Sequence, residues 1–290
     1  MNTTRLSGAI TALITPCNPD GTVDIDALGP LIDAQVQAGV VGLFVLGTAG
    51  QGPMFTPAER KALLREITAA SADRLAVVAH IGAMPTDTAV DLAADAADAG
   101  AYAISSVPPV YYRPDARAVT DYYRALAAAS DLPLLAYNNP PATGFDLRPS
   151  HAQSMHAEGL IAGVKQASDS VADMHALVAA GVPVWMANST LNTAALAMGA
   201  RGTISTITNV VPELFVNLFN AMQSADLHAA RSIQLNIDAV AAILRAPTIG
   251  ALHAGAALRG LPGGRPRPPL RMPDSSETGA IALAVEMALA

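Results

Sequence analysis

The chain has 290 residues, of which 51% are hydrophobic and 14% charged, and its formal net charge is −7 at pH 7. This composition excludes a disordered chain, and the acidic balance argues against nucleic acid as a partner. No run reaches the roughly 18–20 consecutive apolar residues of a membrane-spanning helix, so we expect no membrane partner. Cys17 is the only cysteine, which excludes an intrachain disulfide. Without a secretory signal pattern at the N-terminus, we expect a cytoplasmic protein.

Short β-rich runs alternate with longer Ala- and Leu-rich stretches of helical period. The sequence predicts eight strands, at residues 10–15, 42–46, 76–81, 103–107, 134–137, 163–165, 184–187 and 203–206. Helices are predicted between them, over residues 25–38, 56–70, 86–99, 115–129, 149–157, 170–180 and 190–198. This order indicates an α/β fold, a closed (β/α)8 TIM barrel. An open doubly wound sheet is the alternative, but the chain has neither a Gly-x-Gly-x-x-Gly turn nor a P-loop.

Helical patterns without strands follow the last predicted strand, at residues 212–221, 227–244 and 248–259. A proline-rich stretch over 261–269 then precedes a final amphipathic helix over 275–289. We therefore predict two domains: the barrel with the active site over residues 1–222, and a helical C-terminal domain over 223–290. The arginines next to the prolines, Arg265, Arg267 and Arg271, are expected in a solvated linker.

Lysine is scarce in this chain: of 17 basic residues only Lys61 and Lys165 are lysines. Lys61 and Arg60 lie in a charged stretch that is typical of a solvated helix face. Lys165 instead ends an apolar run at the carboxyl end of the sixth strand, where barrel enzymes carry their active sites. Gly163, on the same side of that strand, leaves room for a bulky group.

A lysine differs from an arginine in that its amine can lose its proton and attack a carbonyl group. Burial lowers the pKa of the amine from about 10.4 toward neutrality. We therefore predict that Lys165 is a nucleophile. The alternative is a strand-end lysine that reaches solvent or pairs with a carboxylate.

Loops after other strands lie on the same face of the predicted barrel. Tyr137 ends the fifth strand, and its phenol could move protons at a carbonyl bound to the lysine; packing at a strand end is the alternative. The loop Gly47-Thr48-Ala49-Gly50 could present backbone N–H groups to a carboxylate, or be only a turn.

Other candidate groups are weaker. Tyr111 and Tyr112 follow the fourth strand, and at most one of them faces the site. His80, which ends the third strand, is expected to pack in the core or beside the site rather than to act in it. The histidines do not have metal-binding spacing on one helix, so we predict no metal site.

Taken together, four motifs resemble the dihydrodipicolinate synthase/N-acetylneuraminate lyase family. They are Gly-Thr-x-Gly at 47–50, Pro-Pro-x-Tyr at 108–111, Tyr-Asn-x-Pro-x-x-Thr-Gly at 137–144 and Gly-Val-Lys-x-Ala at 163–167. The similarity extends over nearly the whole chain. It implies a TIM barrel with a C-terminal helical domain, usually assembled as a homotetramer from two dimers. It also implies pyruvate chemistry through a lysine Schiff base, without a metal or an organic cofactor.

The resemblance also implies roles for individual residues. Lys165 matches the Schiff-base lysine and Tyr137 the proton-shuttling tyrosine. Thr48 matches the hydroxyl that links this tyrosine to a second one. Tyr111 matches that second tyrosine, which in the family often projects from the neighbouring subunit.

Further positions match the substrate site of the family. Gly47, Thr48 and Ala49 would hold the pyruvate carboxylate, mainly through backbone N–H groups, and Ile204 would line the substrate pocket. One departure concerns the second substrate: Ala142 stands where dihydrodipicolinate synthases usually carry a carboxylate-binding arginine. Another is Gln51, which replaces the usual glutamate.

We therefore predict a Schiff-base-forming aldolase or lyase that joins or cleaves pyruvate and an aldehyde. Because the arginine is absent, the expected substrates are 2-keto-3-deoxy sugar acids rather than aspartate semialdehyde. One alternative is a 4-hydroxy-tetrahydrodipicolinate (dihydrodipicolinate) synthase whose carboxylate contact comes from elsewhere. Another is a barrel that binds a 2-oxo acid without catalysis.

Overall fold

The computed structural model describes residues 2–290; Met1, with which the predicted barrel domain begins, lies outside them. Within this range, eight parallel strands close into a barrel in chain order, with β1 paired to β8. The strands are β1 (Gly8–Ala12), β2 (Gly42–Val45), β3 (Ala76–His80), β4 (Ala103–Ser106), β5 (Leu134–Asn138), β6 (Gly163–Gln166), β7 (Val184–Met186) and β8 (Gly202–Ser205). The predicted TIM barrel is confirmed, and the open sheet was the wrong alternative.

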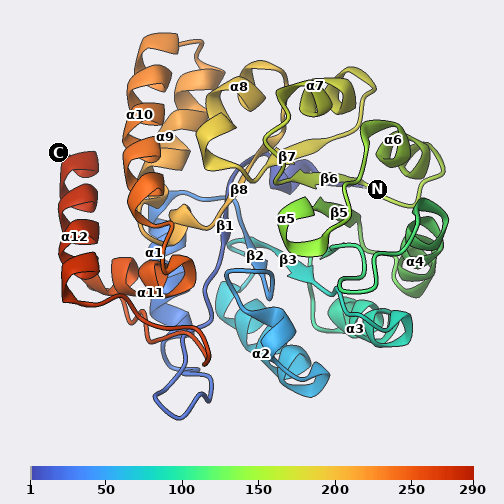
Figure 1. Ribbon diagram of the computed structural model, residues 1–290, viewed down its shortest axis with the longest axis horizontal. Helices are drawn as coiled ribbons and strands as arrows, with labels where there is room; N and C mark the ends of the chain where they lie inside the picture. The colour runs from blue at the N-terminus through green and yellow to red at the C-terminus, as the bar shows by residue number, and fades with distance from the viewer. Residues whose placement is uncertain (1) are drawn as a thin grey trace.

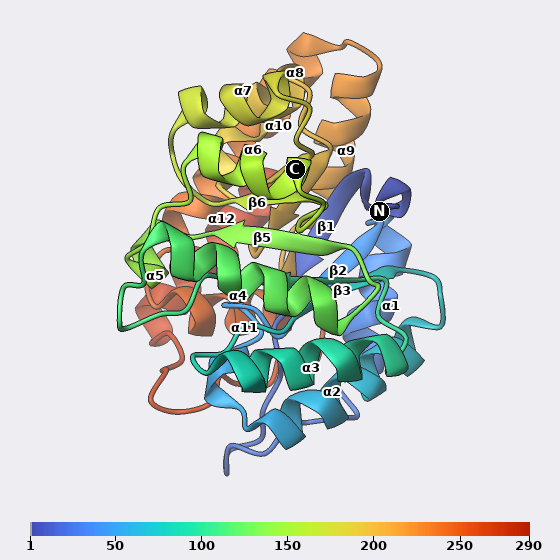
Figure 2. The same ribbon diagram turned by 90° about the vertical axis from the view of Figure 1, so that its right-hand side faces the viewer.

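Helices surround the strands (Figure 1), and Figure 2 shows α2, α3 and α4 lying side by side over them. They are α1 (Leu28–Ala38), α2 (Pro57–Ser71), α3 (Thr86–Asp98), α4 (Ala116–Ala129), α5 (Pro140–Thr143), α6 (Pro149–Ala157), α7 (Val171–Ala179) and α8 (Asn192–Ala197). The helix predicted over 190–198 is divided, because the 3-10 turn η3 (Ser189–Leu191) precedes α8. The short helix α5 was not predicted, since its two leading prolines resemble a turn.

Helix α2 begins with a capping box, and its first turn carries an arginine that attaches it to the barrel. Thr56 accepts a hydrogen bond from the Glu59 N–H, and the Glu59 carboxylate accepts one from the Thr56 N–H, so the helix begins with a capping box. The prediction that Arg60 lies on a solvated face is wrong: it is 4% exposed and donates to the carbonyl oxygens of His80 and Gly82. Buried arginine donors thereby attach α2 to the end of β3.

The first strand begins and ends earlier than predicted. Gly8 pairs with Gly202 of β8, and a side chain at Gly202 would lie only 2.1 Å from the Gly8 carbonyl oxygen. Leu13 and Ile14 follow the strand and are still buried, although they belong to no strand. Apolar character therefore continues past the end of the strand, and the predicted range 10–15 lies too far along the chain.

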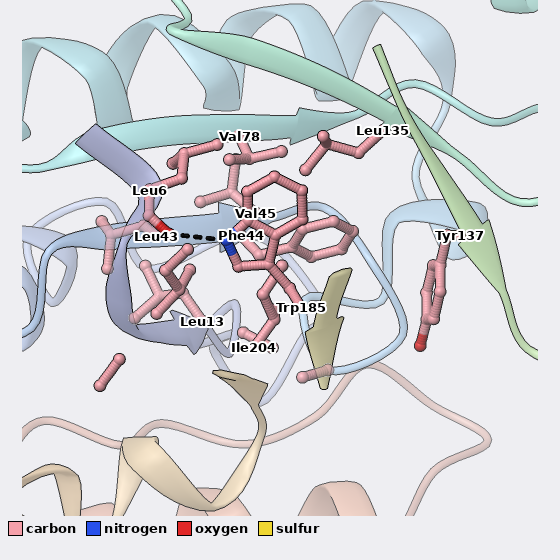
Figure 3. Close-up of a cluster of buried hydrophobic side chains, with 14 of the residues drawn as sticks. Leu6, Leu13, Leu43, Phe44, Val45, Val78, Leu135, Tyr137, Trp185 and Ile204 are labelled. Atoms are coloured by element: carbon pink, nitrogen blue, oxygen red, sulfur yellow. Dashed lines mark hydrogen bonds between the residues drawn. The ribbon is translucent and has the colours of Figure 1, made fainter. Parts of the chain in front are cut away.

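Trp185 of β7 closes the amino-terminal side of the barrel interior. It is fully buried, and its Nε1 donates to the Leu6 carbonyl oxygen at 2.6 Å (Figure 3). Its ring lies against Gly163, where an added Cβ would come within 2.7 Å of it. The space that Gly163 leaves is therefore filled by this indole, below the level of Lys165 in the barrel.

The remaining helices lie on one side of the barrel (Figure 1). They are α9 (Pro212–Gln223), α10 (Leu227–Ile243), α11 (Thr248–Leu258) and α12 (Ser275–Leu289). Since α9 contacts both β1 and α10, it joins the two predicted domains, and their division after residue 222 stays a prediction. Over residues 2–290 no single helix has the length and apolarity to cross a membrane; α10 and α11 meet these criteria only as a pair, bent by 119°.

The proline-rich segment is a solvated linker only in part: Arg265 and Arg271 are exposed, as we predicted, whereas Arg267 is half-buried. Arg267 pairs with Glu59 at 2.7 Å and lies over the ring of Phe55. Arg271 pairs with Glu277 of α12, also at 2.7 Å. Both side chains therefore tie this segment to helices.

Candidate active site

Lys165 lies inside the carboxyl-terminal half of the barrel. It is 3% exposed, and its β6 position pairs with Tyr137 of β5 on one side and Trp185 of β7 on the other. Its amine Nζ lies 3.5 Å from the centre of the Phe44 ring and 3.9 Å from the centre of the Tyr137 ring. Among the described residues no carboxylate pairs with it. The amine of Lys165 is therefore buried next to the phenol of Tyr137, as the sequence predicts.

The protonation state of Lys165 depends on two opposing effects. The faces of two aromatic rings favour an ammonium by about 0.5–2 kcal/mol. Removal of a charged amine from water costs several kcal/mol, so it is the larger effect. Burial accordingly lowers the pKa of Lys165 well below its ordinary value of 10.5. The site holds an amine that can be neutral, and hence nucleophilic, near neutral pH.

The same burial predicts that Lys165 destabilises the fold. Between its lowered folded-state pKa and its unfolded pKa of about 10.4, the unfolded chain binds more protons, so the stability of the wild type rises with pH. We expect Lys165→Met to raise the midpoint of thermal unfolding by a few degrees at neutral pH. The difference should shrink as the pH approaches 10. Calorimetry at several pH values measures it, and a constant or growing difference would contradict the assignment.

Tyr137 is the proton-transfer candidate beside the amine. It is 6% exposed, and its hydroxyl accepts a hydrogen bond from Asn139 Nδ2 at 3.1 Å. Burial raises the pKa of Tyr137, and hydrogen bonding with Thr48 and Asn139 partly offsets this. In Figure 3 it lies apart from the packed Leu, Val and Trp side chains. Thr48 therefore lies near Tyr137, and its role in linking two tyrosines stays a prediction. Asn139 is a partner that we did not predict.

Two further rings complete the wall around the amine. Phe44 of β2 packs edge-on against Tyr137, with ring centres 5.7 Å apart, and His80 packs against the same tyrosine at 6.2 Å. Burial, and after it the charge of Arg60, holds the pKa of His80 well below its usual value, so it stays neutral. Sequence reasoning missed Phe44. Gly47 accommodates the Phe44 ring, since a Cβ at Gly47 would lie 2.4 Å from it.

The loop after β2 presents free backbone donors at the mouth of the barrel. Thr48 is exposed and Ala49 is buried, and within residues 2–290 neither N–H has a hydrogen-bond acceptor. The carbonyl oxygens of Gly47 and Thr48 are already used, since they accept bonds from Gly52 and Gln51. Free N–H groups on such a turn attract an anion. The geometry is therefore suitable for the carboxylate site that we predict for Gly47, Thr48 and Ala49.

Two predicted site residues lie outside this group. Tyr111 is 80% exposed and stacks edge-to-face on Tyr112, with ring centres 5.0 Å apart. In the single chain it does not contact Tyr137. Ile204 of β8 is 1% exposed and lies in the interior of the barrel (Figure 3). Its predicted contact with substrate stays a prediction.

Two hollows open at the carboxyl ends of β6, β7 and β8. One has a volume of about 620 Å³ and lies beside α5; the other has about 300 Å³ and lies beside α10. They share Ala167, two residues after Lys165, and Asn188. Their linings are polar. Charged side chains line the larger hollow, namely Asp146, Arg148, Asp169 and Asp173, together with Ser168 and Ser170. The smaller hollow is lined by Arg245, Ser189, Thr190 and Thr206, and Asn188 lines both.

Chemically, this arrangement combines three parts. A buried amine can attack a carbonyl carbon, an adjacent phenol can move protons, and free N–H groups can hold a carboxylate. Over the described residues 2–290, no group of three or more His, Cys, Asp or Glu side chains is placed to hold a metal ion.

Residues 5–287 match the model of the Dihydrodipicolinate synthetase family. The N-acetylneuraminate lyase of Rhizobium meliloti strain 1021 is 34% identical over 99% of this chain and 96% of its own. The 4-hydroxy-tetrahydrodipicolinate synthase of Mycolicibacterium paratuberculosis is 34% identical over 91% and 89%. Among solved structures, the Escherichia coli K12 prophage protein YagE in complex with pyruvate aligns with a TM-score of 0.94 at 26% identity, over 98% of each chain.

Proposed function

The chain belongs to the dihydrodipicolinate synthetase family, and from this premise we propose a Schiff-base-forming aldolase or lyase acting on pyruvate and an aldehyde. It is an enzyme of the carbon–carbon lyase type. The observation that carries the proposal is the amine of Lys165, buried between two rings and next to the phenol of Tyr137.

In the proposed reaction the neutral amine of Lys165 attacks the keto carbon of pyruvate. The carbinolamine loses water to give a protonated imine, with Tyr137 transferring the protons and Thr48 and Tyr111 completing the relay. Loss of a methyl proton gives an enamine, whose carbon adds to the aldehyde. Hydrolysis of the new imine then releases the longer 2-oxo acid and restores the amine. Cleavage runs through the same steps in reverse, and the imine accepts the electron pair of the breaking bond.

The carboxylate of the 2-oxo acid is proposed to bind the loop after β2. The N–H groups of Thr48 and Ala49 have no acceptor within the described chain, and Gly47 lets the loop approach Phe44. This contact places the keto carbon toward the amine of Lys165. It requires no metal or organic cofactor.

We propose hydroxylated substrates, of the 2-keto-3-deoxy sugar acid type. The hydroxyl and amide groups that line the two hollows can hydrogen-bond sugar hydroxyls. Ala142 provides no charge for a second carboxylate. A 4-hydroxy-tetrahydrodipicolinate synthase remains the second candidate because Arg245, which has no ion-pair partner among the described residues, lines the smaller hollow and could bind that carboxylate.

A direct substrate comparison tests this specificity. We expect cleavage of 2-keto-3-deoxygluconate with a kcat/KM about 10²-fold above that for condensation of pyruvate with aspartate semialdehyde, because a missing charge-assisted contact costs a few kcal/mol. Coupled assays with both substrates measure the ratio. The reverse preference, lost in Arg245→Ala, would establish the synthase instead.

We propose a homotetramer, a dimer of dimers, in the cytoplasm; the free, buried Cys17 fits a reducing compartment. Tyr111 is 80% exposed on its loop, which fits a residue that completes the active site of a neighbouring subunit.

We expect Tyr111→Phe to lower kcat about tenfold or more. Specific activity should also fall when the wild type is diluted below the dissociation constant of the oligomer. Light scattering beside the assay checks both, and a fully active monomer would contradict the proposal.

A further inference from the structure

The segment before α12 returns to the barrel and contacts the loop after β2. In Figure 1 this red segment runs beside the blue loop that follows β1. There Cys17 and Arg265 pair through their backbones, with N–H to oxygen distances of 3.0 and 3.1 Å. At Arg267 the same segment reaches Gln51, 216 residues earlier in the chain. The C-terminal part of the chain therefore lies against a loop of the candidate active site.

Gln51 connects the two segments through both polar atoms of its side chain. Its Nε2 donates to the carbonyl oxygen of Arg267 at 3.3 Å, and its Oε1 accepts the Arg267 N–H at 3.2 Å. The side chain is only 2% exposed. Without this amide the Arg267 N–H would lose its acceptor, which is costly, whereas the Arg267 carbonyl oxygen would keep its hydrogen bond from the Leu270 N–H at 3.2 Å.

The backbone of Gln51 belongs to the turn that carries Thr48 and Ala49. Its N–H donates to the Thr48 carbonyl oxygen at 3.2 Å. Its φ of 53° lies in the left-handed region, where a residue other than glycine is strained. Such a conformation persists only where the surrounding contacts hold it. The bonds from the Gln51 side chain to Arg267 are contacts of this kind.

Arg267 is itself held rigidly. Its guanidinium donates to the carbonyl oxygens of Met54 at 2.9 Å and Gly21 at 3.0 Å, and pairs with Glu59 at 2.7 Å. It also lies over the Phe55 ring, 4.1 Å from the ring centre. Arg267 therefore offers Gln51 a fixed attachment point, connected at once to α2 and to the loop after β1.

We propose that Gln51 and Arg267 are positioning residues that hold the Thr48–Ala49 turn in its carboxylate-binding form. The inference rests on the proposed function, in which this turn binds the carboxylate of the 2-oxo acid. It gives the C-terminal segment a role in binding the first substrate, because the segment supplies the backbone to which Gln51 attaches.

Pyruvate affinity in Gln51→Ala tests the proposal. Borohydride trapping at increasing pyruvate should show a half-saturating concentration raised about tenfold, with the full extent of trapping kept at saturation. Gln51→Glu keeps the acceptor for the Arg267 N–H and should recover part of the affinity. Arg271→Ala is the matched control: it breaks an ion pair of the same segment, with Glu277, and should leave the affinity unchanged.

Amide hydrogen exchange gives a readout that does not depend on catalysis. Exchange of residues 47–52 should be faster in Gln51→Ala than in the wild type or Arg271→Ala. If the wild type traps no pyruvate, the proposed function fails, and this measurement still decides the inference. The inference is overturned if amide exchange in Gln51→Ala equals that of the wild type. It is also overturned if the wild type traps pyruvate and Gln51→Ala binds pyruvate with the same affinity. Should Gln51→Ala not fold, Arg267→Ala, which keeps the backbone attachment, should show a smaller shift in the same direction.

Discussion

Lys165→Arg is expected to abolish covalent capture of pyruvate. Treated with borohydride and pyruvate, the wild type should gain the mass of one reduced pyruvate adduct, and the variant should gain none. The reason is that a guanidinium keeps its proton under all working conditions and cannot attack a carbonyl carbon. Aldolase activity should fall by a factor of about 10⁴ or more, as when a covalent nucleophile is removed elsewhere. Intact-protein mass spectrometry and a steady-state assay measure the two effects.

Lys61→Arg is the matched control, because Lys61 is the only other lysine in the chain. It lies at the surface, paired with Asp91 at 2.7 Å, and should keep both the adduct and the activity. Lys165→Met serves as a second inactive variant in case arginine does not fit the buried space. An adduct of equal size in Lys165→Arg would remove the enzyme proposal.

Tyr137→Phe is expected to lower kcat strongly while pyruvate can still be trapped on Lys165. The phenyl ring keeps the packing against Phe44 and the amine of Lys165, but it has no hydroxyl to move protons. We expect kcat to fall about 10²- to 10³-fold, within the range for loss of a general acid–base group. Borohydride should still trap pyruvate, more slowly, because the nucleophile remains. Rapid-quench trapping beside steady-state kinetics measures both rates.

Tyr123→Phe controls for the loss of a buried hydroxyl. Tyr123 is also buried, and its phenol donates to the Ser106 carbonyl oxygen at 2.7 Å. This variant should lose stability while it keeps kcat. Equal losses of kcat in the two variants would assign Tyr137 a structural role.

The sequence predicted the barrel well because its strands alternate with helices of clear period. The eight strands all lie within a few residues of their predicted positions, as β6 and β3 illustrate. The errors in strand boundaries arose where buried apolar residues continue beyond the end of a strand. Leu13 and Ile14 are buried beyond the end of β1, so hydrophobicity alone displaced that strand.

Charged residues were harder to place than apolar ones. Arg60 and Arg267 stand in polar stretches that predict solvent exposure, yet both donate to carbonyl oxygens of distant segments. Such contacts depend on tertiary structure and leave no local pattern. Among the site residues, Lys165 was identifiable because lysine is scarce. Phe44 was not, since an aromatic residue in a buried strand has no distinguishing signal.

The indole of Trp185, below Lys165, closes one end of the site. Trp185 and the Leu6 backbone fill the amino-terminal side of the barrel interior, so we expect substrates to reach the amine from the carboxyl-terminal side. A molecule bound nearer the opening lies on the path to the amine below it. We therefore expect the keto acid to bind before the aldehyde in condensation and to leave after it in cleavage.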